Sequence, residues 1–432
     1  MVYVCTYLYK ILFIYIVKSR LLCYYVIEWG EFMSVFTNEE KMLLELIKSD
    51  INSTKNDLCF DGLDFDLIFK NSNEHSVNML VFDSLNFNDI QLPQEVLTNW
   101  LYFTSRKMTI RENVLLVQKQ LTKLLEQNDV RYFIFKGFSA STFYKNPQLR
   151  ECGDIDVFVE REEFEEIKKL LCDNGFKLAD DSNDMHWSFV RSGVEVELHH
   201  RFWDVYENEF GNFTKKYLSD SLDHVIEYSV DDYTFYGPDY IRHGLILILH
   251  LINHIQSGGI GLRHVCDFAY FANSKIFADN LDEFKDVCEK CGVSTVFNVV
   301  SNICFKYLGV LNCSYAKGYK QQLCDLVLKD ILTSGNFGRL NQSEYYASNA
   351  FTSKKKKNEN VFKRVFRFCQ TAWEPCKKHK ILLVIAPFYV FIRYLFRVLL
   401  GKRPKVNFVK MMKKSSQRNS IYSQLNIFGE DL

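Results

Sequence analysis

The stretch that decides the fold is residues 133–159, FIFKGFSASTFYKNPQLRECGDIDVFV. It begins with one apolar run and ends with another, and Asp154 and Asp156 lie two residues apart at the start of the second run. Alternation along a strand places both aspartates on one face and the apolar residues between and after them on the other. Two carboxylates on one face are costly to bury without cations, so the pattern favours a divalent metal, typically magnesium. The alternative is a pair of acids on a solvated edge strand or in a turn.

A glycine follows the first apolar run. Lys136 and Gly137 end that predicted strand, and small hydroxyl residues beginning with Ser139 come next. Glycine lets the backbone approach a phosphate, and hydroxyl residues can open a helix whose N-terminus faces an anion. Arg150 lies just before the two aspartates, within reach of the same pocket. These residues predict a phosphate-binding loop beside the metal site.

A third carboxylate is expected on a later strand. Residues 194–199, VEVELH, alternate strictly between apolar and polar side chains. Glu195, Glu197 and His199 therefore share one face of a predicted strand. A third carboxylate beside an aspartate pair completes a two-metal site, in which one acid can also activate an attacking hydroxyl.

These motifs resemble the DNA polymerase beta-like nucleotidyltransferase superfamily and, more narrowly, a bacterial group known as uncharacterised nucleotidyltransferases. The hallmarks of that group are a lysine-glycine strand end, an arginine before D-I-D, and a later E-L-H-x-R strand. The chain matches them with Lys136-Gly137, Arg150, Asp154-Ile155-Asp156 and Glu197-Leu198-His199-His200-Arg201. The similarity covers roughly residues 115–271, with weaker likeness to about residue 338. One position departs from the superfamily pattern, because Phe138 stands where glycine or serine is usual.

The resemblance implies an α+β (mixed α/β) fold, with a small mixed sheet as the nucleotidyltransferase core and helical regions on its N-terminal and C-terminal sides. It implies that two magnesium ions are held by Asp154, Asp156 and Glu197, and that Glu197 also helps to deprotonate the acceptor. The substrates would be an NTP and an unknown hydroxyl acceptor, which could be a small molecule, a protein or an RNA end. The implied substrate-binding residues are Lys136, Gly137, Ser139, Arg150, His199 and Arg263.

Two other functions remain open from the sequence. One is a catalytically degenerate relative that binds nucleotide without transferring it, which Phe138 favours and the intact carboxylates disfavour. The other is a membrane-peripheral accessory protein of surface-polysaccharide assembly, in which the basic C-terminal region would matter most.

Composition narrows the class of protein. The chain has 432 residues, so two or three domains are expected. Hydrophobic residues make up 47% and aromatic residues 15%, which excludes global disorder. The formal net charge is zero, so no whole-protein field attracts nucleic acid or membrane. The 13 cysteines lack framework spacing and are expected to be reduced thiols of a cytoplasmic protein, with Cys288 and Cys291 structural.

The expected organisation has five parts. Residues 1–32 are apolar but interrupted by basic residues, so they favour a mis-assigned start, with translation beginning at Met33. Residues 33–108 predict a helical region, 109–235 the nucleotidyltransferase core, 236–345 a helical domain and 346–432 a basic, aromatic-rich region. Before the core, one helix is expected to start at Pro93 and a separate helix to span about 110–127. After the aspartates, a helix at 162–174 and strands at 176–178 and 187–190 are expected.

The predicted helix that begins at about residue 240 carries His250 and His254 four residues apart. This spacing can bind zinc. The glutamate of an H-E-x-x-H motif is missing, so a packing or substrate-contact role is expected instead. In the next predicted helix Arg263 and Asp267 also lie four residues apart, and the alternative to a substrate role for Arg263 is a surface salt bridge between them.

The C-terminal region mixes aromatic, apolar and basic residues. Pro387 and Arg393 interrupt the apolar stretch 381–400, which argues against a membrane span. A basic, aromatic-rich amphipathic segment can lie on an anionic membrane surface, so the protein would be membrane-associated. The alternative is helices that pack on the catalytic unit. The tail from residue 410 to 432 is polar and is expected to be mobile.

Overall fold

The computed structural model describes residues 36–54, 58–85, 92–182, 185–202, 207–256, 259–336, 369, 373, 375, 382, 385–399 and 408–429. Residues Asn38–Leu432 form one compact unit. The predicted N-terminal extension, residues 1–32, lies outside the described residues, as does most of the stretch 346–384. The domain boundaries expected from the sequence stay predictions.

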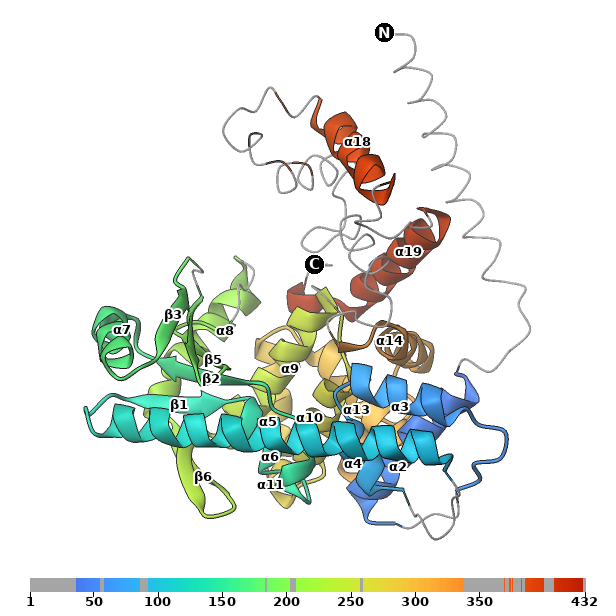
Figure 1. Ribbon diagram of the computed structural model, residues 1–432, viewed down its shortest axis with the longest axis horizontal. Helices are drawn as coiled ribbons and strands as arrows, with labels where there is room; N and C mark the ends of the chain where they lie inside the picture. The colour runs from blue at the N-terminus through green and yellow to red at the C-terminus, as the bar shows by residue number, and fades with distance from the viewer. Residues whose placement is uncertain are drawn as a thin grey trace. The chain divides into compact units, whose positions relative to one another are not determined.

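A five-stranded mixed sheet forms the core, which confirms the predicted fold class (Figure 1). Its spatial order is β1-β2-β5-β4-β3. Strands β2 and β5 run parallel, and the other neighbouring pairs are antiparallel. The bounds are Tyr132–Phe135 for β1, Asp154–Val159 for β2, Lys177–Asp180 for β3, His186–Arg191 for β4 and Val194–His199 for β5.

One face of this sheet is apolar and is covered by two helices, α5 (Gln94–Glu126) and α7 (Phe164–Asp173). Ile155 and Val157 of β2 point to this face, with Val196 of β5. They pack with apolar side chains of α5 and α7 in one buried cluster. Each methylene group buried between these layers contributes about 0.8 kcal/mol of favourable free energy. Because side chains alternate along a strand, the residues between the apolar ones lie on the opposite face of the sheet.

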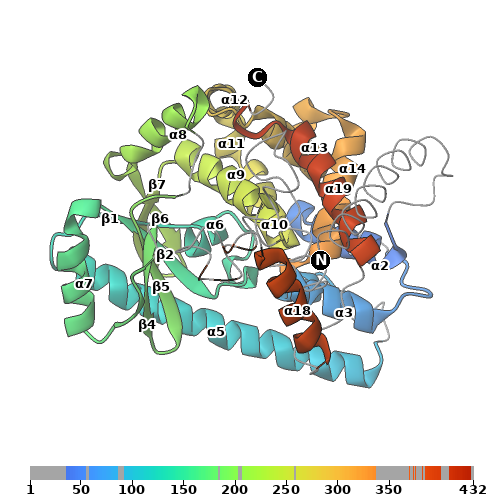
Figure 2. The ribbon, with the colours of Figure 1, turned by 90° about the horizontal axis from the view of Figure 1, so that it is seen from above.

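Helix α5 is a single helix of 33 residues, whereas the sequence was expected to form two. The reason is that no glycine or proline interrupts residues 94–126, so nothing ends the helix between its two apolar stretches. Trp100 in its first half is buried against Phe69 of α3 (Phe65–Glu74) and Phe82 of α4 (Asn78–Asp83). The second half packs on the sheet, so α5 lies along both the sheet and the N-terminal helices (Figure 2).

A group of helices follows the sheet in sequence. It includes the predicted helix at residue 240, and its members pack on one another and on α2 (Asn38–Asn52). The bounds are α9 Tyr240–Gln256, α10 Leu262–Ala272, α11 Lys275–Asp279, α12 Leu281–Lys290, α13 Ser294–Leu308 and α14 Gln321–Ser334. Two further elements are not predicted from the sequence. They are α8 (Glu209–Ser219) and the hairpin of β6 (Val225–Val230) and β7 (Tyr233–Pro238), which packs against β1.

The C-terminal residues differ from their expectation. Residues expected to be a mobile tail form α19 (Phe408–Leu425), which packs against α14. Arg418 of α19 is fully buried and donates to the carbonyl oxygen of Ile255 at 2.5 Å, so the helix is anchored to the end of α9. Helix α18 (Ala386–Leu399) begins one residue before Pro387, in the first turn, where proline is tolerated. Within the residues described, no helix has both the length and the hydropathy needed to cross a bilayer.

Candidate active site

The polar face of the sheet gathers the predicted carboxylates. Strands β2 and β5 are neighbours in register, with Asp156 opposite Glu197 and Asp154 opposite Glu195. Side chains of directly paired residues point to the same face. Three of the four are the carboxylates predicted to hold metal, and Glu195 is the most solvent-exposed residue of β5's polar face. The parallel β2–β5 pairing therefore brings together residues more than 40 positions apart in the chain.

His199 connects the two central carboxylates. Its Nε2 lies 3.1 Å from Oδ1 of Asp156 and 3.0 Å from Oε2 of Glu197. The ring is buried and stands edge-on to the ring of Phe135. Lys136 approaches from the end of β1, with its Nζ 2.7 Å from Oδ1 of Asp156. Asp156 is thus contacted by an ammonium and an imidazole, while its own side chain is buried.

His186 is a site residue that the sequence analysis missed. It lies on β4 opposite His199, and its Nε2 is 3.8 Å from Oε1 of Glu197. The ligand atoms of His186, Glu197 and His199 all lie within 4.8 Å of one another. The only signal in the sequence was a histidine at the start of a predicted strand, and the β4–β5 register is needed to place it at the site.

The aspartates differ in their electrostatic environment. Desolvation by the surrounding protein raises the pKa of Asp154, although its side chain still reaches solvent, and the charge of Asp156 raises it further. Burial alone would also raise the pKa of Asp156, but Lys136 and His199 outweigh it and lower that pKa. Burial would lower the pKa of His199, and its bonds to Asp156 and Glu197 raise it instead. The contacts of Lys136 and His199 therefore favour the ionised form of Asp156, whereas desolvation and the neighbouring charge of Asp156 disfavour the ionised form of Asp154.

The turn after β1 is strained. Lys136 has φ 56° and ψ −136°, a conformation that is uncommon outside glycine. Gly137 follows with φ 30°, and a Cβ at this position would lie 3.8 Å from the backbone oxygen of Asp154. Strained residues that the surrounding fold holds in place often mark functional sites. Here the turn brings the Lys136 ammonium back over the carboxylates and brings Gly137 next to the start of β2.

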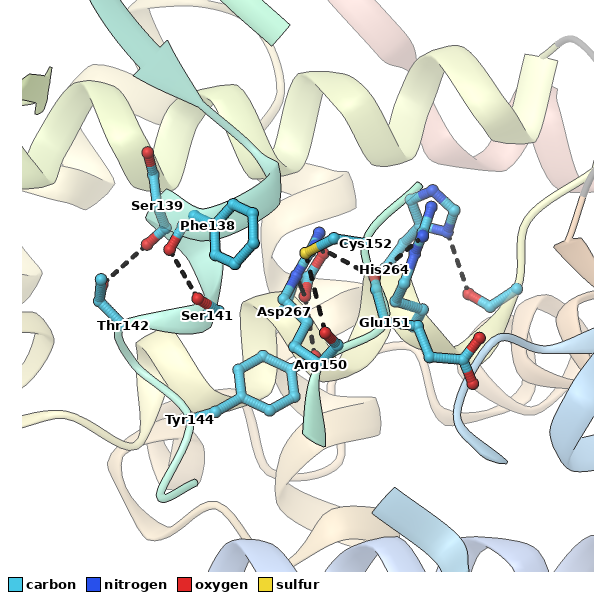
Figure 3. Close-up of polar contacts among 12 residues, drawn as sticks. Phe138, Ser139, Ser141, Thr142, Tyr144, Arg150, Glu151, Cys152, His264 and Asp267 are labelled. Atoms are coloured by element: carbon cyan, nitrogen blue, oxygen red, sulfur yellow. Dashed lines mark hydrogen bonds and ion pairs between the residues drawn. The ribbon is translucent and has the colours of Figure 1, made fainter. Parts of the chain in front are cut away.

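The hydroxyl groups after this turn bond within the protein. Ser139 is buried in α6 (Gly137–Ser141), and its Oγ donates to the carbonyl oxygen of Ile134 at 2.6 Å. Ser141 donates to Phe138 O and Thr142 to Ser139 O, each at 2.8 Å (Figure 3). These contacts are structural, so the role of Ser139 at a triphosphate stays a prediction. Phe138 points into the apolar core, away from the carboxylates, so its bulk does not occupy the site.

Arg150 forms a buried ion pair with Asp267 of α10. Its Nε and Nη2 donate to the two carboxylate oxygens of Asp267, each at 2.8 Å (Figure 3). Its Nη1 contacts Glu151 O and Cys152 Sγ, and Tyr144 OH donates to Asp267 as well. All three guanidinium nitrogens are therefore bonded to the protein, and the predicted contact of Arg150 with a phosphoryl group stays a prediction. Asp267 pairs with Arg150, so the alternative of a surface salt bridge to Arg263 is wrong.

Arg263 lies at the edge of the carboxylate site. Its Nη1 donates to Glu151 O at 3.3 Å, and its charge acts to lower the pKa of Asp154. The backbone N–H of Arg263 donates to His75 O, which fixes the first turn of α10. Lys136 and Arg263 are thus two cations that act to lower the pKa of the same aspartate, and their contact with a substrate stays a prediction.

Comparison with known proteins bears on this site. A family model described as uncharacterised nucleotidyltransferase matches residues 61–309, which is more than half of the chain and contains every site residue named above. Searches of curated proteins and of solved structures found no match. The extent of the family match shows that the chain belongs to the uncharacterised nucleotidyltransferase family.

Proposed function

We propose that the protein transfers a nucleoside monophosphate from an NTP to a hydroxyl acceptor with release of pyrophosphate, and that the reaction depends on magnesium. Membership of the family supports nucleotidyl transfer in general. The observation that carries the finer proposal is the pairing of Asp156 with Glu197 on parallel strands, with Asp154 on the same face. We also propose that the fold belongs with the DNA polymerase beta-like superfamily and that the group is bacterial.

The residues present fit a site for divalent cations. Asp154, Asp156 and Glu197 offer the hard oxygen ligands that magnesium prefers. Lys136 and His199 already contact one oxygen of Asp156, and desolvation together with the charge of Asp156 disfavours the ionised form of Asp154, which a bound cation would stabilise. Two magnesium ions bound there would orient the triphosphate and stabilise charge on the attacking and leaving oxygens.

The chain's own residues would act as follows. The acceptor oxygen attacks the α-phosphorus, a new P–O bond forms, and the bond from that phosphorus to the bridging oxygen breaks. The electron pair leaves with pyrophosphate, and Glu197 draws off the acceptor proton. Lys136 and Arg263 would contact the triphosphate, where fixed positive charge stabilises the charge that develops. Gly137 leaves room for the nucleotide beside the start of β2.

The experiment that tests this function incubates the protein with each α-³²P-labelled NTP, magnesium and cell extract, followed by separation of labelled products. Asp156→Asn removes a proposed ligand, and Glu195→Gln is the matched control on the exposed end of β5. The proposal expects a labelled product with the wild type and the control and none with Asp156→Asn. Labelling that is equal in all three proteins would reject the site.

One observation favours membrane contact as an additional property. Helix α18 exposes large apolar side chains at helical spacing, among them Phe388 at 71% and Phe396 at 64%. An apolar helix face within a basic segment suits the interface of an anionic bilayer. The full chain is expected to float with phosphatidylglycerol vesicles, and Phe388→Glu with Phe396→Glu is expected to abolish flotation. Flotation that persists in this double variant would remove α18 as the contact.

A further inference from the structure

Three histidines meet between α9 and α10. His250 and His254 lie one turn apart on α9, and His264 lies in the first turn of α10. Their ring centroids are 4.4 to 4.9 Å apart, and one ring nitrogen from each falls within 4.8 Å of the others. We propose that this three-histidine cluster binds one transition-metal ion, for which zinc is the best match.

Local structure explains why the cluster is in place. Residues four apart lie on the same face of a helix, so His250 and His254 both point toward α10. Gly261 sets the start of α10, because a Cβ there would lie 3.1 Å from His75 O and 3.0 Å from a side-chain carbon of Asn336. A side chain at this position would force these neighbours apart by a few tenths of an ångström, so glycine suits the close approach. The first turn of α10 is thereby fixed with His264 against the α9 pair.

The hydrogen bonding of His264 leaves one nitrogen for a ligand. Its Nδ1 is 3.3 Å from Gly261 O, and a carbonyl oxygen requires this nitrogen to carry the proton. The Nε2 atom then has a lone pair, and it is buried without a hydrogen-bond partner among the residues that the structure describes. Metal-binding histidines commonly bond the second nitrogen to a backbone carbonyl in this way. A metal ion would complete the coordination of a buried polar atom that otherwise has no partner.

The chemistry of the cluster selects the kind of metal. Three neutral imidazoles suit zinc and similar transition metals, whereas magnesium requires oxygen ligands. Burial lowers the pKa of both His254 and His264, in the direction of the neutral rings that a metal requires. Lys136 and Arg263 also act on this cluster, and their charge will reduce its affinity for a cation.

Three protein ligands leave one coordination position for water or substrate. The ion would also join α9 to α10. Its ligand His264 directly follows Arg263, whose charge acts to lower the pKa of Asp154. The cluster uses none of the carboxylates proposed to hold magnesium, and the inference does not rest on the proposed nucleotidyl transfer. It differs from the sequence-based expectation that His250 and His254 serve packing or substrate contact, which stays a prediction. The third histidine joins the pair only through the packing of α10 on α9.

The experiment measures zinc in the full chain, purified without a histidine tag and equilibrated with micromolar zinc and millimolar magnesium. Zinc per protein is determined by mass spectrometry after removal of free metal. Because His186, Glu197 and His199 form a second cluster with ligand spacing, His199→Gln is compared with His264→Gln, and His224→Gln on the exposed surface is the control. Circular dichroism verifies that each variant is folded.

The proposal expects one zinc in the wild type, in His224→Gln and in His199→Gln, and at least a tenfold weaker affinity in His264→Gln. Cobalt in place of zinc should give the intense visible absorption of a four-coordinate site, which is lost in the same variant. If His264→Gln does not fold, His250→Gln is used for the same comparison. Absence of zinc in the wild type, or undiminished zinc in the folded variant of the cluster, would overturn the inference, whatever the outcome of the nucleotide-labelling experiment.

Discussion

At the scale of single residues, the two aspartates of β2 differ in what their charge does for stability. The pKa of Asp154 is raised, so its ionised form costs stability at neutral pH, whereas the pKa of Asp156 is lowered, so its charge stabilises the fold. Without metal, Asp154→Asn should melt at the same or a higher temperature than the wild type. Asp156→Asn should be less stable by about 2 kcal/mol, because Lys136 and His199 lose a charged partner. Thermal and urea unfolding in EDTA measures both.

The reverse order of the two variants would show that the charge balance described for this face is wrong. Both variants should lack transfer activity, because each removes a proposed metal ligand. Comparison of their stabilities with their activities separates the electrostatic role of each carboxylate from its role in catalysis.

The two glutamates of β5 provide a second residue-scale prediction. Glu197 lies opposite Asp156 and contacts His199, whereas Glu195 is exposed. Glu197→Gln should slow single-turnover transfer at least a hundredfold, in line with the loss of a general base, while NTP affinity changes little. Glu195→Gln should differ from the wild type by less than threefold. Calorimetry with magnesium and NTP gives the affinity, and rapid quench gives the rate. A slower Glu195→Gln would place the third ligand opposite Asp154.

At the scale of elements, the ion pair of Arg150 and Asp267 joins the segment before β2 to α10. Both side chains are buried, so removal of one partner leaves an uncompensated charge. Arg150→Met and Asp267→Leu should each destabilise the protein by about 3 to 5 kcal/mol, and the double variant should recover part of that loss. Urea unfolding measures these changes. A fully stable, inactive Arg150→Met protein would instead support the phosphoryl contact expected from the sequence.

Sequence alone predicted much of this element-level structure. The alternation of apolar and polar residues around Asp154 and Glu197 predicts strands β2 and β5. It also predicts the face of each carboxylate, because successive side chains of a strand point to opposite faces of the sheet. The pairing of β2 with β5 was expected only because a two-metal site needs the third carboxylate on a neighbouring strand. No local sequence pattern specifies which strands pair. The sequence predicts two helices over the span of α5, although no glycine or proline between them would end a helix.

Contacts between distant elements explain what the sequence did not reveal. His186 and His264 join their clusters through strand register and helix packing, which leave no local pattern. Ser139 and Arg150 fitted the expected pocket by position, yet their polar atoms bond to Ile134 and Asp267. Arg418 lies in a polar C-terminal segment, so the sequence does not indicate that its helix packs on the protein. Its hydrogen bond to the carbonyl oxygen of Ile255 on α9 is visible only in the structure.

At the scale of the whole molecule, buried histidines make stability depend on pH. The buried ring of His75 contacts Leu332 O through Nε2 and accepts a hydrogen bond from the backbone N–H of Leu262 at Nδ1. Burial lowers the pKa of His75 from 6.5 to about 4. The unfolded chain binds a proton at higher pH than the folded protein, so stability falls as pH drops from about 6.5 to 4. This histidine alone contributes up to about 3 kcal/mol to that loss.

His75→Gln should therefore weaken the acid dependence, because glutamine has no proton to take up in this range. Urea unfolding at pH 7.5, 6 and 5 checks this, with the exposed His224→Gln as the control. The slope of stability against pH should decrease for His75→Gln and stay unchanged for the control. Equal slopes in all three proteins would mean that His75 is not held neutral by the fold.

The central claim is that the paired carboxylates of β2 and β5 bind the metal that activates a nucleotide. The most direct measurement is an anomalous difference map from crystals grown with manganese and a non-hydrolysable NTP. The account predicts anomalous peaks about 2 Å from the carboxylate oxygens of Asp154 and Asp156, with Glu197 at one of them and the triphosphate beside Lys136. Nucleotide bound with its metal elsewhere, and no peak between β2 and β5, would contradict it.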